Sequence, residues 1–302
     1  MQSKWLNPDK QAIIVCRPAL PKDTPDIMEL THRIWEGEDY VPEVWSDWLA
    51  DPEGLLAVAE YSGRVAGLGK LTRLSADEWW MEGLRVHPDF EGRGIASHLN
   101  DYVLDYWRHN GSGVIRLATG SYNEPVHHVC KRSGFQKVAE YTSYVATSLP
   151  SQQNETTETF SPLGQVDIQR AANMASESPT VALSFGLMDL GWKWGRPKAE
   201  YISKAMVNQW AYWWRGERGL LVARKDGGEE SERMPTIQLV ACSLEELIEC
   251  LQDFRGWVAA LEYAQVKWFA SVRPEMKAIL EATGFQRKWE DSLFIYEKAW
   301  AS

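Results

Sequence analysis

The pattern of apolar and polar positions divides the first half of the chain into short strands and amphipathic helices. Short apolar runs predict strands, and apolar residues three or four positions apart predict helices. The predicted strands cover residues 12–16, 55–61, 65–74, 79–86, 114–118 and 137–146, and the predicted helices cover about 24–35, 41–50, 95–109 and 124–133. Strands and helices mixed in this order predict an α/β fold with a mixed sheet (α+β in character).

The second half of the chain repeats features of the first. Residues 150–164 are mostly polar and read as a linker. Beyond them, Thr283-Gly-Phe-Gln-Arg287 repeats Ser133-Gly-Phe-Gln-Lys137, Leu220-Leu-Val-Ala is similar to Leu55-Leu-Ala-Val, and residues 237–241 and 266–270 read as the fourth and fifth strands of a second copy. We therefore predict domains at residues 1–149 and 165–302.

Composition narrows the class of protein. The chain has 302 residues, a formal net charge of −10 and four cysteines without metal-type spacing. An acidic chain is not expected to bind nucleic acid generally, and the cysteine spacing predicts no zinc site. No apolar leader or membrane-length run is visible, so we expect no membrane association. The sequence indicates a cytoplasmic protein with reduced thiols, either a monomer or a homodimer.

A glycine-rich loop between the fourth strand and the next helix is the first sign of chemistry. Pro88 ends the strand, and Glu91-Gly-Arg-Gly-Ile-Ala96 leads into the helix. Backbone N–H groups of such a loop, with those of the helix start, form an anion site suited to a diphosphate. The alternative is a plain tight turn into a surface helix. The spacing matches neither a P-loop nor a dinucleotide-binding loop.

This segment resembles the acyl-CoA-binding loop of the GNAT superfamily of N-acetyltransferases. Leu84-Arg-Val-His-Pro88 precedes the loop as in that family, and Asn123 to Phe135 is similar to a second family motif. The order of the predicted elements from residue 11 to residue 147 also resembles the GNAT order. The resemblance implies a GNAT acyl-CoA N-acyltransferase fold, here duplicated with a degenerate second copy, and acetyl-CoA as co-substrate.

The resemblance also implies which residues bind acetyl-CoA. It places the pantetheine arm and an oxyanion-stabilising backbone N–H near residues 84–86, and the diphosphate at the glycine loop. The sequence departs from the family at Glu91, where Gln or Arg is usual; Arg93 could supply the compensating charge. The predicted cofactor-binding residues are Leu84, Arg85, Val86, Glu91, Gly92, Arg93, Gly94, Ile95, Ala96 and Asn123.

Acetyl transfer from a thioester needs a neutral amine and a proton for the leaving thiolate. Glu82 lies four residues before Val86, where a family glutamate often faces the acceptor, so we predict that it receives the amine or its proton. The alternative is a structural carboxylate held by the backbone. Cys130 stands where many members have a tyrosine acid and is the second catalytic candidate, although buried cysteine is usually inert packing.

The segment between the first two predicted helices resembles the histidine N-acetyltransferase-like branch of the family, which has a tandem architecture. The resemblance implies an acceptor pocket there, with Asp39, Tyr40 and Trp45 as substrate-binding candidates. The predicted function is transfer of an acetyl group from acetyl-CoA to a primary amine of a small molecule, possibly a free amino acid. The alternatives are a protein or peptide N-acetyltransferase and a non-catalytic CoA sensor.

The second copy lacks the glycine loop. Ser243-Leu-Glu-Glu246 predicts a capping box directly after the fourth strand, and acids at a helix start repel a diphosphate. We therefore predict that residues 165–302 bind no CoA. Trp210, Trp213 and Trp214 have the spacing of one helix face, and Trp192 or Trp194 is a candidate lid over the acceptor.

Overall fold

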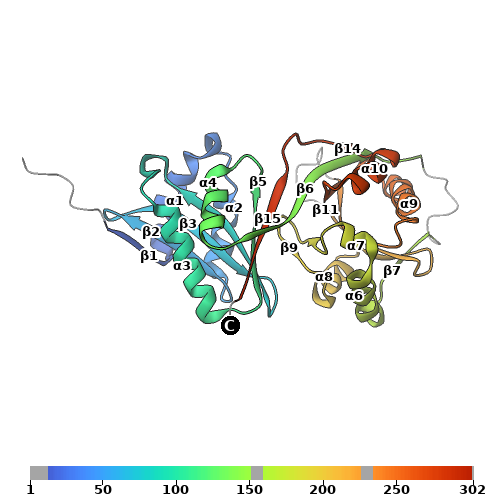
Figure 1. The fold of residues 1–302 in the computed structure, drawn as a ribbon, viewed down its shortest axis with the longest axis horizontal. Helices are drawn as coiled ribbons and strands as arrows, with labels where there is room; N and C mark the ends of the chain where they lie inside the picture. The colour runs from blue at the N-terminus through green and yellow to red at the C-terminus, as the bar shows by residue number, and fades with distance from the viewer. Residues whose placement is uncertain (1–12, 151–158, 226–233, 301–302) are drawn as a thin grey trace, which may run out of the picture. The chain divides into compact units, whose positions relative to one another are not determined.

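The structure, a computed structural model, describes residues 13–150, 159–225 and 234–300. These residues form two compact units (Figure 1). Unit 1 comprises the described residues of Met1–Leu117, Pro125–Gln136 and Glu297–Ser302. Unit 2 comprises the described residues of Ala118–Glu124 and Lys137–Tyr296.

The first part of the chain forms the predicted elements in the predicted order. The strands β1 to β5 are hydrogen-bonded in sequence order, antiparallel except for the parallel pair β4 and β5. The elements are β1 (Ile14–Pro18), η1 (Pro21–Asp23), α1 (Thr24–His32), η2 (Trp35–Gly37), α2 (Val41–Ala50), β2 (Leu55–Tyr61), β3 (Arg64–Arg73), β4 (Glu78–Val86), η3 (Pro88–Phe90), α3 (Ile95–Asn110), β5 (Val114–Gly120) and α4 (Glu124–Arg132). Residue 12 of the predicted first strand lies outside the described residues.

The two faces of this sheet carry different helices. Leu68 of β3 packs into a buried apolar cluster with side chains of α1 and α2, including Ile27 and Trp45. On the other face, a Cβ built on Gly67 would lie 3.0 Å from side-chain atoms of both Ile95 and Leu99, so α3 lies directly against that glycine. The helix seen in teal in Figure 1 is α3. Alternate residues of β3 therefore point to different layers.

A β-bulge interrupts the pairing of β3 with β4. Leu68 pairs with Arg85 and Lys70 pairs with Glu82, so the single residue Gly69 faces two residues, Gly83 and Leu84. Gly83 has a φ of +65°, which a glycine adopts without strain. A bulge adds one residue to one strand and shifts its alternation. Because of that shift, Glu82 and Arg85 lie on the same face of the sheet, the face that α1 and α2 cover.

The second part of the chain repeats the strand order. In unit 2, β7, β10, β11, β12 and β13 are neighbours in that order, and β12 and β13 are again parallel. The remaining elements are β6 (Gln136–Thr147), β7 (Phe160–Pro162), η4 (Gln165–Asp167), α6 (Ile168–Glu177), α7 (Pro179–Leu183), β8 (Met188–Asp189), β9 (Trp194–Gly195), α8 (Ala199–Val207), β10 (Ala211–Trp214), β11 (Gly219–Lys225), β12 (Pro235–Ala241), α9 (Leu247–Ala260), β13 (Gln265–Ser271), α10 (Pro274–Ala282), β14 (Gln286–Arg287) and β15 (Leu293–Ala299).

Several expectations for the second half need correction. β7 lies inside the predicted linker, whose residues 151–158 are outside the described residues. By its neighbours, β11 takes the place of β3 and not of β2. Trp213 and Trp214 lie on strand β10 rather than on a helix face. The helix after β12 begins at Leu247, so the capping box at Ser243 is wrong: the Ser243 hydroxyl donates to the Glu246 carboxylate, 2.8 Å away.

The repeated Gly-Phe sequences form the same turn. Gly134 and Gly284 have φ values of +76° and +74°. The N–H of Phe135 donates to the carbonyl of Cys130, and the N–H of Phe285 donates to that of Leu280. A glycine followed by a residue that bonds five positions back is a Schellman helix end. This shared turn supports the internal duplication that the sequence predicted.

The end of each half belongs to the unit formed mainly by the other half. In unit 2, β6 pairs antiparallel with β13 over residues 141–147 and 265–271. In unit 1, Glu297 at the end of β15 binds the buried Arg116, with Oε2 2.7 Å from Nε. The Lys298 ammonium donates to the Ser133 carbonyl. Residues 137–147 therefore lie in unit 2 and residues 297–300 in unit 1, unlike the predicted boundary at residue 149.

Candidate active site

The glycine loop forms an uncapped helix start. After η3, Gly92 and Gly94 adopt φ values of +73° and +83°. Gly94 is the N-cap residue of α3, and no side chain caps the helix. A Cβ on Gly92 would have no atom within 4 Å, so the backbone angle rather than crowding requires glycine there. The N–H groups of the first turn of a sixteen-residue helix are a suitable binding place for a phosphate.

Two charged side chains of the loop are exposed. Arg93 lies over the Tyr61 ring, 5.2 Å from its centroid, and donates to the Tyr61 hydroxyl at 3.0 Å. Glu91 is exposed, so its carboxylate is solvated. Because this carboxylate is solvated, it repels a bound diphosphate less strongly than a buried carboxylate would.

His87, which the sequence analysis did not single out, stabilises the turn that precedes the glycine loop. His87 is 1% exposed. Its Nε2 lies 3.0 Å from the Glu29 carboxylate, and its Nδ1 accepts the N–H of Asp89 at 3.1 Å. Asp89 in turn binds the Arg33 guanidinium through two hydrogen bonds. These contacts fix η3 against α1 and so orient the turn that follows. In the sequence, only the presence of His87 in Leu-Arg-Val-His-Pro could have indicated these contacts. A single histidine is not enough to predict that it holds the turn before the glycine loop.

Glu82 lies beside the bulge on β4. It is half-buried, and the Thr72 hydroxyl donates to its Oε1 at 2.6 Å. The parallel pairing of β4 with β5 ends at Met81 and Leu117, so Glu82 stands at the first position beyond it. A bulge also leaves backbone groups outside the ladder. This arrangement places a carboxylate next to backbone N–H groups at the point where the two strands stop pairing.

The Arg85 side chain points to the segment between α1 and α2. Its Nε and Nη2 bind the two oxygens of Asp39, at 2.9 Å and 3.2 Å. The guanidinium lies 4.4 Å from the Trp35 ring centroid and 5.4 Å from that of Tyr40. The side chain predicted to bind acetyl-CoA is therefore held by residues predicted to bind the acceptor. Burial raises the pKa of Tyr40, so its hydroxyl group remains protonated at neutral pH.

Trp45 belongs to the core rather than to an open pocket. It is 2% exposed, and its indole N–H donates to the Thr24 hydroxyl at 3.0 Å. Trp48, which the sequence analysis did not single out, is the tryptophan that lies at the bulge. A Cβ on Gly83 would lie 2.5 Å from Cη2 of Trp48. Trp48 also meets the Tyr40 ring edge-on, with centroids 6.0 Å apart.

The remaining two candidates lie near α4. Cys130 is 1% exposed, and burial raises its pKa to about 12. Such a thiol is a weaker acid than an ordinary alkyl thiol such as that of CoA, so it is poorly matched to protonating a leaving thiolate. Asn123 is half-buried immediately before α4. The roles of both residues stay predictions.

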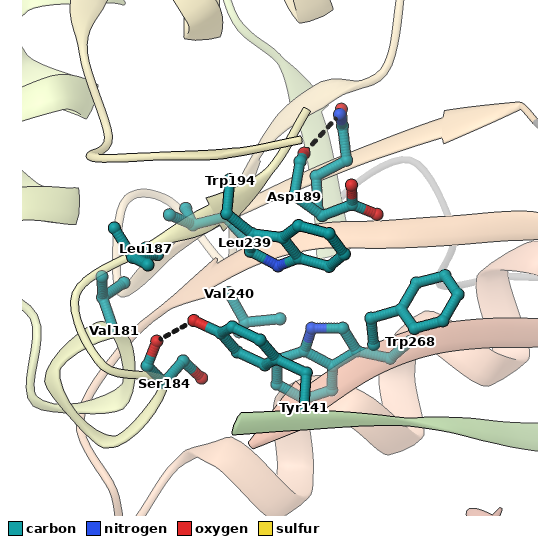
Figure 2. A pocket seen from close by; sticks show the side chains of 11 residues that line it. Tyr141, Val181, Ser184, Leu187, Asp189, Trp194, Leu239, Val240 and Trp268 are labelled. Atoms are coloured by element: carbon teal, nitrogen blue, oxygen red, sulfur yellow. Dashed lines mark hydrogen bonds between the residues drawn. The ribbon is translucent and has the colours of Figure 1, made fainter. Parts of the chain in front are cut away.

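Unit 2 has a pocket where its fourth and fifth strands stop pairing. β12 and β13 pair at Thr236–Ile237, and the next residues of β12 line the pocket (Figure 2). The Trp194 and Tyr141 rings there lie nearly parallel, with centroids 5.5 Å apart, and the Tyr141 hydroxyl donates to the Ser184 carbonyl. Trp194 is thus buried inside unit 2 and is not a lid over another pocket.

The start of α9 also differs from that of α3. Glu246 is its N-cap residue, and its carboxylate binds Arg218 with a closest distance of 2.6 Å. The described residues between β12 and α9 include no glycine. With a carboxylate at its start and no glycine before it, α9 is not suited to binding an anion in the way that the loop of unit 1 is.

Comparison with known proteins identifies the first part of the chain. Residues 24–135 match the profile of the Acetyltransferase (GNAT) family. This part of the chain belongs to the GNAT acetyltransferase family. Histidine N-acetyltransferase of Xenopus tropicalis is 30% identical over 97 residues, which cover 32% of this chain and 30% of that protein. Mycothiol acetyltransferase of Propionibacterium freudenreichii is 32% identical over 111 residues, 35% of each chain. The match thus spans about a third of the length of these relatives.

Solved structures show the GNAT fold across nearly the whole chain. A GCN5-related N-acetyltransferase from Sphaerobacter thermophilus aligns with a TM-score of 0.62 at 15% identity, covering 94% of this chain and 95% of that one. A tandem GNAT protein from the clavulanic acid biosynthesis pathway aligns with a TM-score of 0.57 at 13% identity, covering 96% and 99%. The predicted duplicated GNAT fold is thereby confirmed. Among the residues described, no helix is both long and apolar enough to cross a membrane.

Proposed function

We propose that unit 1 transfers an acetyl group from acetyl-CoA to a primary amine of a small molecule. The proposal rests on one observation: two features suited to this reaction lie on one strand–turn–helix segment. The uncapped start of α3 offers N–H groups to the CoA diphosphate. The bulge in β4 places the Glu82 carboxylate beside backbone groups outside the ladder.

The reaction follows from these positions. The amine nitrogen attacks the thioester carbonyl, an N–C bond forms, and the C–S bond breaks. Glu82 receives the proton of the amine, directly or through water. Backbone N–H groups at the bulge stabilise the oxyanion. The CoA thiolate leaves and takes up a proton; a buried Cys130 thiol with a pKa of about 12 is a weak donor for that step, so solvent is the better source.

Unit 2, in this proposal, binds no acetyl-CoA. Its strand opening is occupied by Trp194 and Tyr141, and Glu246 stands at the start of α9. A small-molecule acceptor agrees with the named activities of the histidine and mycothiol relatives. The four cysteines are free thiols, which a reducing compartment such as the cytoplasm preserves.

A second candidate is acetylation of a peptide N-terminus. N-alpha-acetyltransferase RimI of Mycobacterium tuberculosis is 28% identical over 124 residues, covering 40% of this chain and 77% of that protein. CoA release from acetyl-CoA, measured with mixed free amines and separately with short peptides, distinguishes the two. Release with the small amines supports the proposal, release with peptides alone supports the second candidate, and no release with either refutes both.

The role of Glu82 is tested by Glu82→Gln. We expect kcat to fall by about 10²–10⁴, with the dissociation constant of acetyl-CoA within about twofold of the original, because the side chain faces the acceptor. The matched control is Glu91→Gln in the exposed loop, which should strengthen acetyl-CoA binding and affect kcat little. An equal loss of turnover and acetyl-CoA binding in Glu82→Gln would instead identify Glu82 as a structural carboxylate.

A further inference from the structure

The Arg85 guanidinium is held rigidly next to the proposed amine site. Its side chain is 12% exposed, and that of its ion-pair partner Asp39 is fully buried. A third hydrogen bond runs from Nη1 to the carbonyl of Leu84, in the bulge itself, at 3.2 Å. Trp35 and Tyr40 lie against the guanidinium. A guanidinium fixed in this way loses little conformational entropy when it binds a further group.

The guanidinium has hydrogen-bonding capacity left. An arginine side chain carries five N–H groups, one on Nε and two on each terminal nitrogen. Among the described residues, Asp39 takes the N–H on Nε and one on Nη2, Leu84 takes one on Nη1, and the Tyr40 hydroxyl is a fourth partner of the guanidinium. One N–H therefore remains, and it can donate a charge-assisted hydrogen bond to one oxygen of a carboxylate.

The bulge brings this cation onto the same face as Glu82. Residues three apart on a regular strand point to opposite faces. The extra residue opposite Gly69 cancels that difference, because Arg85 pairs with Leu68 and Glu82 with Lys70, two residues apart on β3. Burial raises the pKa of Tyr40 most; Arg85, against the Tyr40 ring, lowers this pKa, and the charge of Glu82 raises it.

We propose that Arg85 binds a carboxylate that the acceptor carries next to its amine, so that the acceptor class is a free α-amino acid. Glu82 then receives the amine and Arg85 the carboxylate of one zwitterion. The inference rests on the proposed acetyl transfer and adds the substrate class to it. A peptide N-terminus has an amide in place of that carboxylate and cannot form the charged pair with Arg85.

The test compares matched acceptors with the unaltered protein. The probes are histidine, histidinamide and histamine, and leucine, leucinamide and isoamylamine, each assayed by CoA release. We expect the amino acid of an accepted set to exceed its amide and its decarboxylated amine in kcat/KM by about tenfold or more. The carboxylate makes the neighbouring amine more basic and less often neutral. Ordinary amine reactivity at neutral pH therefore favours the amide, which is the opposite order.

Variants assign the preference to Arg85. Arg85→Lys and Arg85→Gln should lower the ratio of amino acid to amide by about tenfold to a hundredfold. Because Arg85→Gln leaves the buried Asp39 unpaired, the double variant Arg85→Gln/Asp39→Asn is included and should lose the ratio equally. The matched control is Arg73→Gln on β3, an exposed arginine whose carboxylate partner is Glu53, which should keep the ratio.

The outcomes separate this inference from the function on which it rests. Equal rates with the amino acid and its amide, or a ratio that survives in the Arg85 variants, overturn the carboxylate site while acetyl transfer stands. Absence of CoA release with every amine in both sets overturns acetyl transfer itself and the inference with it.

Discussion

The bulge at Gly83 is the feature on which the geometry of the proposed site depends most, and Gly83→Ala tests it. A side chain at a φ of +65° costs about 1–2 kcal/mol. The new Cβ would also lie 2.5 Å from Cη2 and 2.7 Å from Cζ3 of Trp48, and overpacking of this kind costs about 1–3 kcal/mol. We expect the free energy of unfolding to fall by about 2–5 kcal/mol in total.

The control for this substitution is Gly63→Ala, in the turn between β2 and β3. Gly63 has a φ of +81°, and a Cβ there would have no atom within 4 Å. Only the backbone cost of about 1–2 kcal/mol applies. The difference between the two variants, about 1–3 kcal/mol, therefore measures the contact with Trp48. Urea unfolding followed by circular dichroism, with unchanged denaturant slopes, gives both values.

Two further readouts make the reasoning refutable. In a Trp48→Phe background the cost of Gly83→Ala should approach that of Gly63→Ala, because the shorter ring no longer meets the new Cβ. Gly83→Ala should also lower acetyl transfer, whereas Gly63→Ala should not. Equal destabilisation by the two substitutions, or full activity in Gly83→Ala, would show that the close packing of Trp48 on the bulge is not important.

Two other predictions concern residues away from the bulge. Cys130→Ala should change the rate of acetyl transfer less than about threefold and leave the pH–rate profile unshifted. The loss of a buried side chain should lower the free energy of unfolding by about 1–2 kcal/mol. A rate loss of a hundredfold or more would instead identify Cys130 as the proton donor. A fragment ending at residue 150 should be less stable than unit 1 in the full chain, because it lacks Glu297, Lys298 and Trp300, which contact Arg116, Ser133 and Trp107; a fragment with full activity and a matching melting temperature would contradict this.

The local features of the fold could be predicted from the sequence. The glycine loop and the Gly-Phe helix ends are specified within a few residues, because each needs a glycine at a positive φ at a fixed place. Gly92, Gly134 and Gly284 all have such angles. The order of strands and helices in the first half also follows from apolar patterns. The duplicated GNAT fold is implied by the resemblance of two motifs to that family, together with the repeated features of the second half.

The features that depend on pairing could not be predicted. Glu82 and Arg85 are three residues apart, which on a regular strand means opposite faces, and only the pairing of β3 with β4 shows the bulge. Trp45 and Trp48 share one helix, yet only the tertiary structure shows that Trp48 covers Gly83. The spacing of Trp213 and Trp214 is compatible with a helix, but both residues lie on β10, the strand next to the edge strand β7.

The unit to which the end of each half belongs could not be predicted for the same reason. Residues 137–147 and 293–299 both form strands, and nothing in either pattern states which strands it pairs with. The neighbours of β6 and the ion pair of Glu297 with Arg116 decide the matter. Burial of that arginine, which also binds Glu78 at 2.5 Å, makes the pairing specific, because a buried unpaired charge is costly.

The central claim is that the chain has one acetyl-CoA site, at the glycine loop of unit 1. Calorimetric titration of the intact protein with acetyl-CoA tests it directly, alongside Gly94→Val, whose β-branched side chain is incompatible with a φ of +83°. We predict one acetyl-CoA per chain, with no measurable binding by a folded Gly94→Val variant. Two sites per chain, or undiminished binding by that variant, would contradict the account.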